Sequence, residues 1–135
     1  MGNFVIKEVK FSSLMQYERE LKNMFTINTY TYHYPDKEVD ASYINGKFDK
    51  LLEHIQGDTT YLLGAFDDDK IVGFIWLYER PFMTYKRMII NSLYIAENYR
   101  SQGIGKQLMH AAYNKCREVN CTEISTDRKS TRLNS

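Results

Sequence analysis

The chain has 135 residues, enough for one domain of ordinary size, and its 43% hydrophobic and 26% charged residues are typical of a globular protein rather than a disordered one. A net charge of +1 provides no basic surface for general nucleic-acid binding, so nucleic-acid partners are not expected. The sequence shows no run of membrane-spanning length and no signal-peptide pattern at its N-terminus, so we expect a cytoplasmic protein without membrane partners.

The N-terminal part predicts a strand and a helix. Residues 4–9 (FVIKEV) are typical of a short strand. Apolar residues at helical spacing predict a helix over residues 14–25, capped by Ser12 or Ser13. Residues 26–35 (TINTYTYHYP) carry no helical period and are interpreted as a loop. Its tyrosines either line a substrate cleft or pack on the core, as aromatic residues commonly do.

A second helix and a hairpin are expected next. The helix is predicted over residues 36–56, with a break near Asn45 and Gly46. Residues 61–66 and 71–78 are apolar strands, and the short acidic segment DDDK between them predicts a hairpin turn. Because this turn brings no further ligands with it, we expect its carboxylates to be solvated and predict no metal site.

The C-terminal part is organised around a strand, a glycine-spaced loop and a long helix. Residues 86–95 are apolar enough for a central strand, and a turn is expected at residues 97–99. The loop at residues 100–105 (RSQGIG) leads into an amphipathic helix over residues 106–119. The first turn of a helix has N–H groups without internal partners, and glycines allow close approach, so this order predicts an anion site. Residues 122–125 begin a strand expected to pair in parallel through a right-handed crossover.

The C-terminal part also contains two cysteines and an unusual last segment. The spacing of Cys116 and Cys121 fits neither a redox motif nor a zinc site, so we expect reduced cysteines.

Residues 127–135 (DRKSTRLNS) have no hydrophobic period and match the translation of a widely used sequencing adapter. We therefore expect a domain at residues 1–126 that is incomplete at its C-terminus, followed by a foreign tail. A sheet that stops within a strand has an unpaired edge, so we expect this truncated chain to be poorly stable and inactive.

The element order and the glycine loop resemble the GCN5-related N-acetyltransferase (GNAT) superfamily. Its acetyl-CoA signature is Arg or Gln, two residues, Gly, one residue, then Gly or Ala, and residues 100–105 fit that pattern. The resemblance covers residues 4–125. It implies an α/β fold with a mixed α+β sheet, in the order strand, helix, helix, three strands, helix, strand. The family's last helix and strands are missing.

The resemblance implies an enzyme that moves an acetyl group from acetyl-CoA to a primary amine of a small molecule or peptide, by direct attack in a ternary complex. In the family, the pyrophosphate rests on loop N–H groups and the pantetheine arm runs beside the fourth strand, which splays from the fifth. A backbone N–H near Tyr94 or Ile95 would polarise the acetyl carbonyl. The implied cofactor-binding residues are Leu93, Tyr94, Ile95, Arg100, Ser101, Gln102, Gly103, Ile104, Gly105 and Lys106.

The acceptor amine must lose a proton before it attacks. For an amine with a pKa of about 10.4, deprotonation at pH 7 costs roughly 4–5 kcal/mol. A carboxylate, acting directly or through a chain of water, would offset part of this cost. Glu79 is the first candidate for this base, and its alternative role is an ion pair with Arg80 or Lys86. Glu97 is the second candidate.

Departures from the family pattern leave alternatives open. The glutamate base that some members carry on the fourth strand falls at Ile89 or Ile90 here, so that assignment does not transfer. The helix that carries a tyrosine general acid in many members is missing. The alternative function is a non-catalytic acyl-CoA-binding module, used as a sensor or structural unit. A dinucleotide-binding unit is disfavoured, because the loop comes late and has only two of the required glycines. Homodimer formation is left open.

Overall fold

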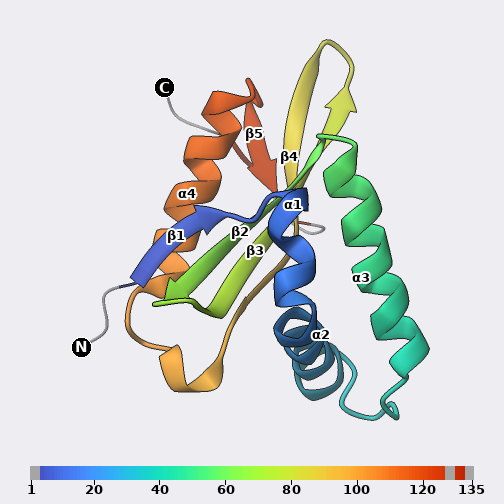
Figure 1. Cartoon of the computed structure of the whole chain (residues 1–135). Coiled ribbons are helices and arrows are strands. Elements are labelled where there is room, and N and C mark those ends of the chain that lie inside the picture. Colours follow the sequence, from blue (N-terminus) through green and yellow to red (C-terminus); the bar gives the residue numbers. More distant parts are fainter. Residues whose placement is uncertain (1–3, 127–129, 133–135) are drawn as a thin grey trace.

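A single mixed sheet forms the centre of the computed structural model, and helices lie on both of its faces (Figure 1). The structure describes residues 4–126 and the backbone of residues 130–132. The strands follow one another across the sheet in chain order: β1 (Phe4–Glu8), β2 (Thr60–Asp67), β3 (Lys70–Phe82), β4 (Tyr85–Ile95), β5 (Glu123–Ser125) and β6 (Ser130–Arg132). All neighbouring pairs are antiparallel except β4 and β5, which confirms the predicted parallel pairing of these two strands.

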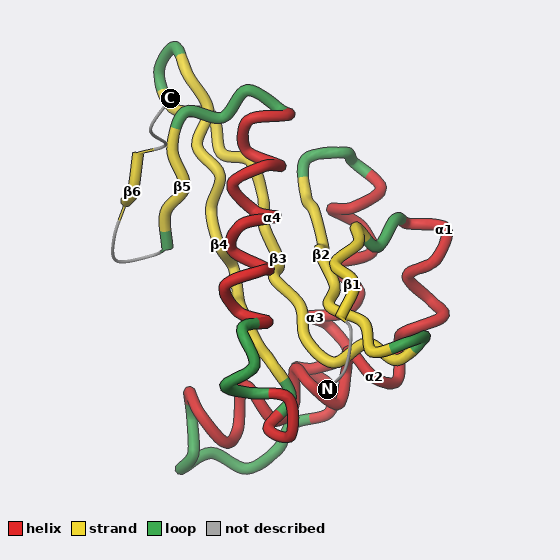
Figure 2. Tube along the Cα trace, turned by 90° about the vertical axis from the view of Figure 1, so that its left-hand side faces the viewer, coloured by secondary structure: helices red, strands yellow, loops and turns green. Residues whose placement is uncertain are grey.

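The helices divide between the two faces of the sheet, as the side view in Figure 2 shows. One face is covered by α1 (Phe11–Leu14), α2 (Glu18–Ile27) and α3 (Ala41–Gln56), and the other by α4 (Ile104–Glu118). Shorter turns are 3₁₀ at Met15–Tyr17 and Glu97–Tyr99 and π-helical at Asn28–His33. This arrangement confirms the predicted element order. Within the described residues, no helix is long and apolar enough to cross a bilayer.

The first helix begins earlier than predicted. Its N-cap is Lys10, without a side-chain capping bond, and Ser12 and Ser13 lie inside α1. The predicted serine cap was therefore wrong. The Val9 N–H still donates to Leu62 O at 2.8 Å, so the chain stays on the sheet through residue 9 and turns directly into the helix. Tertiary pairing thus overrides the local preference for a serine cap.

Residues 26–35 are mostly helical, so the predicted loop was wrong. The helix α2 continues through Ile27, and the π-helical turn follows with a bond from Tyr34 N to Thr29 O at 2.7 Å. A π-turn advances by more residues per turn than an α-helix, so a search for a 3.6-residue period misses it. Tyr30 packs against the core, whereas Tyr32 and Tyr34 are exposed.

The second predicted helix is shorter at its start and unbroken in its middle. Helix α3 begins at Ala41, because Asp40 Oδ1 accepts hydrogen bonds from the N–H groups of Ser42 at 2.9 Å and Tyr43 at 3.3 Å. The expected break at Gly46 is absent from this described helix, since buried side chains on either side of the glycine fix it to the sheet.

A bulge in strand β4 reverses which of its side chains point to each face of the sheet. Trp76 pairs with Ser92 and Leu77 with Ile90, so the register skips Asn91. Before the bulge, Ile90 packs on the α4 side, and after it Tyr94, again an even-numbered residue, packs on the α1–α3 side. One extra residue reverses which side chains face each layer, and bulges also bend a strand away from its neighbours.

Strand β4 leaves β5 just before this bulge. The two strands pair only from Arg87 with Glu123 to Ile89 with Ser125. The C-terminal half of β4 therefore has β3 on one edge and no strand among the described residues on the other. This opening is the splay between the fourth and fifth strands that the resemblance implied.

The C-terminal segment differs from expectation in one respect. The outer edge of β5 is paired with β6, so the expected unpaired edge does not fall on β5. Backbone pairing does not depend on side-chain identity, which allows a segment without a hydrophobic period to add a strand. Residues 127–129 and 133–135 of the expected foreign tail lie outside the described residues.

Candidate active site

The free edge of β4 presents backbone groups from alternate residues. Ala96 N donates to Val72 O at 2.8 Å, so the N–H of Ala96 points toward β3. Because N–H groups alternate between the two edges of a strand, the N–H of Tyr94 also points toward β3. The N–H groups of Leu93 and Ile95 then point into the opening. The N–H of Tyr94 or Ile95 was expected to polarise an acetyl carbonyl. Only the N–H of Ile95 points into the opening, and the N–H of Leu93 points there as well.

Helix α4 begins at an uncapped N-terminus beside this edge. Its N-cap is Gly103, whose φ of 83° lies in the left-handed region that favours glycine, and no side chain caps it. The first bond of the helix runs from Gln107 N to Gly103 O, so the N–H groups of residues 104–106 point outward. A Cβ on Gly105 would lie 3.1 Å from Ile95 Cδ1, so this glycine allows the helix to approach β4 closely.

The Arg100 side chain is engaged within the protein. Its Nε donates to Ile95 O at 2.9 Å and its Nη1 donates to the Tyr32 hydroxyl at 2.7 Å. The guanidinium also lies 4.9 Å from the Tyr32 ring and 5.5 Å from the Tyr94 ring. The hydrogen bond to Tyr32 raises the pKa of Arg100. Arg100 thus ties the π-helical turn to the end of β4, a connection that the sequence alone did not reveal.

The remaining loop residues offer mainly backbone. Ser101, Gln102 and Lys106 are exposed, and Ser101 has a φ of 64°. The Gln102 amide donates to Asn98 O at 3.3 Å, which orders the loop. The structure therefore brings the predicted cofactor residues together around one opening.

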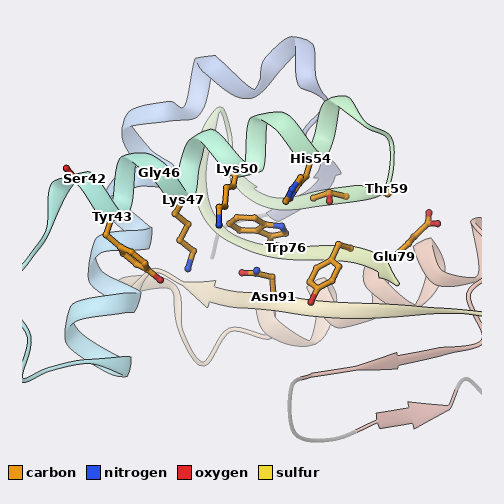
Figure 3. Close-up of a pocket in the computed structure, with 12 residues that line it drawn as sticks. Ser42, Tyr43, Gly46, Lys47, Lys50, His54, Thr59, Trp76, Glu79 and Asn91 are labelled. Atoms are coloured by element: carbon orange, nitrogen blue, oxygen red, sulfur yellow. The ribbon is translucent and has the colours of Figure 1, made fainter. Parts of the chain in front are cut away.

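A cavity of about 670 Å³ lies on the opposite face, between α3 and strands β3 and β4 (Figure 3). Asn91, the bulged residue of β4, points into it, so the cavity meets the sheet where β4 departs from β5. Its lining residues come from three separate parts of the chain: Ser42, Tyr43, Gly46, Lys47, Lys50, His54, Thr59, Thr60, Trp76, Tyr78, Glu79 and Asn91.

The sequence analysis assigned no role to the individual α3 side chains that line this cavity. Each of four polar or aromatic residues on α3 immediately precedes a buried apolar residue of the same helix. The pairs are Tyr43 with Ile44, Lys47 with Phe48, Lys50 with Leu51, and His54 with Ile55. This repeated spacing places the four residues on one stripe beside the buried face, which is a signal that the sequence did contain.

Glu79 lines the cavity, but both of its carboxylate oxygens already have partners. Tyr61 donates its hydroxyl to Oε2, and Lys86 Nζ lies 3.1 Å from Oε1. Burial and the hydrogen bond to Glu79 raise the pKa of Tyr61. The expected alternative role, an ion pair with Lys86, is therefore present. Arg80 instead donates to the Tyr78 hydroxyl at 3.1 Å.

The second carboxylate candidate, Glu97, is exposed in the 3₁₀ turn and does not line this cavity. A smaller cavity of about 330 Å³ is lined by Tyr30 of the π-helical turn, by Tyr34 just after it and by Tyr43 of α3. In the described part of the chain, no group of His, Cys, Asp or Glu side chains is placed to hold a metal ion. Cys116 and Cys121 are both buried free thiols, and burial raises the pKa of each.

Comparison with known proteins agrees with this geometry. The model of the Acetyltransferase (GNAT) family matches residues 18–134. A paia N-acetyltransferase from Thermoplasma acidophilum in complex with coenzyme A is similar, with a TM-score of 0.69 and 24% identity over 90% of this chain and 77% of that chain. A protein from Clostridium difficile 630, described as a possible acetyltransferase, has a TM-score of 0.73 and 18% identity over 91% and 78%.

A third similar structure is an aminoglycoside acetyltransferase from an uncultured soil metagenomic sample, in complex with sisomicin. Its TM-score is 0.68, with 21% identity over 92% of this chain and 76% of that chain. Identities this low establish a shared fold and nothing finer. No match is found among curated proteins.

Proposed function

Because the chain belongs to the GNAT acetyltransferase family, we propose that it transfers an acetyl group from acetyl-CoA to a primary amine of a small molecule. The amine attacks the thioester carbonyl directly in a ternary complex, the carbon–sulfur bond breaks, and CoA leaves as a thiolate that takes up a proton. The observation that carries this proposal is the meeting of two half-sites at the bulge of β4. The free edge and the uncapped helix lie at the opening between β4 and β5, and the cavity reaches the same place from the other face.

On the cofactor side, the proposed contacts are mainly to backbone. The N–H groups of residues 104–106 and the loop at residues 100–103 would hold the pyrophosphate, since a helix N-terminus favours anions. The arm's amides would pair with Leu93 and Ile95 along the free edge, in the manner of an added strand. One of these two N–H groups would polarise the acetyl carbonyl, which carries negative charge in the transition state.

On the acceptor side, Glu79 is proposed to act through water. It lies opposite Met88 on β4, roughly 15 Å along the strand from Leu93, since a strand rises about 3.3 Å per residue. A proton from the attacking amine would therefore reach Glu79 only along a chain of water. Its exposed position outside the cavity makes Glu97 the weaker choice.

The similar structure with sisomicin supports a small-molecule amine as the acceptor class. We further propose that residues 1–126 form the acetyltransferase domain and that the protein acts in the cytoplasm.

The test is release of free thiol from acetyl-CoA by the full chain, measured across a panel of amines alongside calorimetric titration with CoA. Amine-dependent thiol release supports the proposal. CoA binding in the micromolar range without turnover for any amine would instead favour the acyl-CoA-binding module. Absence of CoA binding would refute both functions.

A further inference from the structure

The charges that line the cavity of about 670 Å³, where we place the acceptor amine, are unbalanced. We call it the acceptor cavity. Lys47, Lys50 and His54 come from α3, and Glu79 comes from β3 (Figure 3). Glu79 is already paired with Lys86 and hydrogen-bonded to Tyr61. Within the described residues, neither Lys47 nor Lys50 has a carboxylate at ion-pair distance. The cavity therefore contains two lysines that no carboxylate of the described residues pairs with.

Lys47 is held in a defined place. Its Nζ lies 5.5 Å from the Phe25 ring and 5.9 Å from the Trp76 ring, so two aromatic faces fix the end of a half-buried side chain. Burial lowers the pKa of Lys47, because loss of water disfavours the charged form. An anion beside Nζ would again stabilise the charged form of Lys47, and no described protein group supplies one.

From this arrangement, and resting on the proposed function, we infer that the acceptor amine bound in this cavity also carries an acidic group, held by Lys47 and Lys50. Aromatic side chains of Tyr43, Trp76 and Tyr78 supply apolar walls for the rest of the molecule. The substrate class is thus a small amine with an aromatic or apolar body and a carboxylate or phosphate. A polycationic amine such as sisomicin would meet two uncompensated lysines and bind poorly.

Trp76 allows ligand binding in this cavity to be measured without turnover. It is the only tryptophan in the sequence and it lines the cavity, so its fluorescence reports ligand binding there. The full chain is titrated with 3-phenylpropionate, phenyl phosphate, 3-phenylpropanamide and 2-phenylethylamine. We expect at least one acid to bind about tenfold more tightly than the neutral amide, and 2-phenylethylamine to bind more weakly than either acid. The stronger of the two acids identifies the acidic group as carboxylate or phosphate.

Substitutions then identify which side chains cause the preference for acids over the amide. Lys47→Met and Lys50→Met should each reduce the preference for the acid over the amide several-fold, and the double variant should abolish it. Arg19→Met removes one exposed charge that lines neither cavity and should leave the preference unchanged. Because Lys50 is exposed, Lys50→Met decides the matter if Lys47→Met does not fold.

Equal binding of acid and amide, tighter binding of 2-phenylethylamine, or no saturable response to either acid would overturn the inference. Its outcome is separate from that of the proposed function. Fluorescence can show a preference for acids in a protein that releases no thiol. Conversely, thiol release with 2-phenylethylamine or sisomicin but not with phenylalanine would support acetyl transfer and exclude an acidic acceptor.

Discussion

The two halves of the proposed site are built in different ways. The cofactor half consists of backbone groups from one continuous stretch, residues 93–106, which lie on a strand edge and a helix N-terminus. The acceptor half consists of side chains from α3, β3 and β4, brought together by the fold. The first half should depend on backbone conformation and tolerate most side-chain changes. The second half should depend on the charge and shape of particular side chains.

Substitution of Gly103 should have the largest effect on the cofactor half. A β-branched residue is strained at a φ of 83°, and we expect Gly103→Val to disturb the helix start by roughly 2–3 kcal/mol. The affinity for CoA, measured by calorimetry, should fall about 30- to 100-fold. Trp76 titrations with acids should be unaffected. Unchanged CoA affinity would show that the loop backbone does not hold the cofactor.

Removal of the Glu79 carboxylate should have a moderate effect on turnover. General bases in direct contact contribute about 100- to 10,000-fold, and one acting through water should contribute less. We expect kcat for Glu79→Gln to fall about tenfold at pH 7, with less loss as pH rises and free amine accumulates. Lys86→Met is the matched control, since it removes the ion pair but leaves the carboxylate. An equal loss in both variants would make the ion pair, rather than the carboxylate, the important feature.

The acceptor half should respond to pH through Lys47. Its pKa is lowered by burial, so its charge is lost at a lower pH than that of an ordinary lysine. Affinity for 3-phenylpropionate should therefore fall several-fold between pH 7 and pH 10 in fluorescence titrations. The other titratable or charged groups around it are Tyr43, Lys50, His54, Tyr78 and Glu79 in the cavity and Lys22, paired with Glu18, on α2.

Lys47→Met should remove most of this pH dependence, whereas Arg19→Met should retain it. If the pH dependence persisted in Lys47→Met, another of the surrounding groups would be its source.

The contact between Arg100 and Tyr32 tests whether a side chain far away in the sequence supports the cofactor half. Tyr32→Phe removes the hydroxyl that accepts from Arg100 Nη1 but keeps the ring. A hydrogen bond to a charged group contributes about 1.5–3 kcal/mol in net terms, and an exposed bond such as this one should contribute less. We expect roughly a threefold loss of CoA affinity, because Arg100 also fixes Ile95 O on the free edge. Arg100→Lys should have the larger effect, since it loses both contacts.

The smallest effect concerns Gly46 in helix α3. No atom lies within 4 Å of a Cβ placed there, and alanine is favoured over glycine in a helix interior by about 1 kcal/mol. We expect Gly46→Ala to raise the free energy of unfolding by about 0.5–1 kcal/mol and to leave CoA affinity unchanged. Destabilisation in a denaturant titration would mean that the glycine relieves strain in the helix.

Sequence patterns predicted the loop and the helix start of the proposed cofactor half, and the resemblance to the GNAT superfamily added the strand edge. Residues 100–105 determine a left-handed glycine and an uncapped helix start, and these properties follow from neighbouring residues and from the physics of a single turn. The order of elements followed from hydrophobic periods for the same reason, and the splay of β4 from β5 followed from the resemblance to the GNAT superfamily. Local periodicity failed where the helix widened to a π-turn, where sheet pairing fixed the start of α1, and where buried side chains carry α3 unbroken through Gly46.

Tertiary structure alone decided the acceptor half. Lys47 and Glu79 are 32 residues apart, and no local rule predicts that they line one cavity or that one of them lacks a carboxylate partner among the described residues. The bulge at Asn91 depends on the register of β4 against β3, which is a property of two strands and not of one. Backbone sites can be predicted from nearby sequence, because their geometry is local. Sites made of side chains from distant elements require the fold, because it determines which charges lie together.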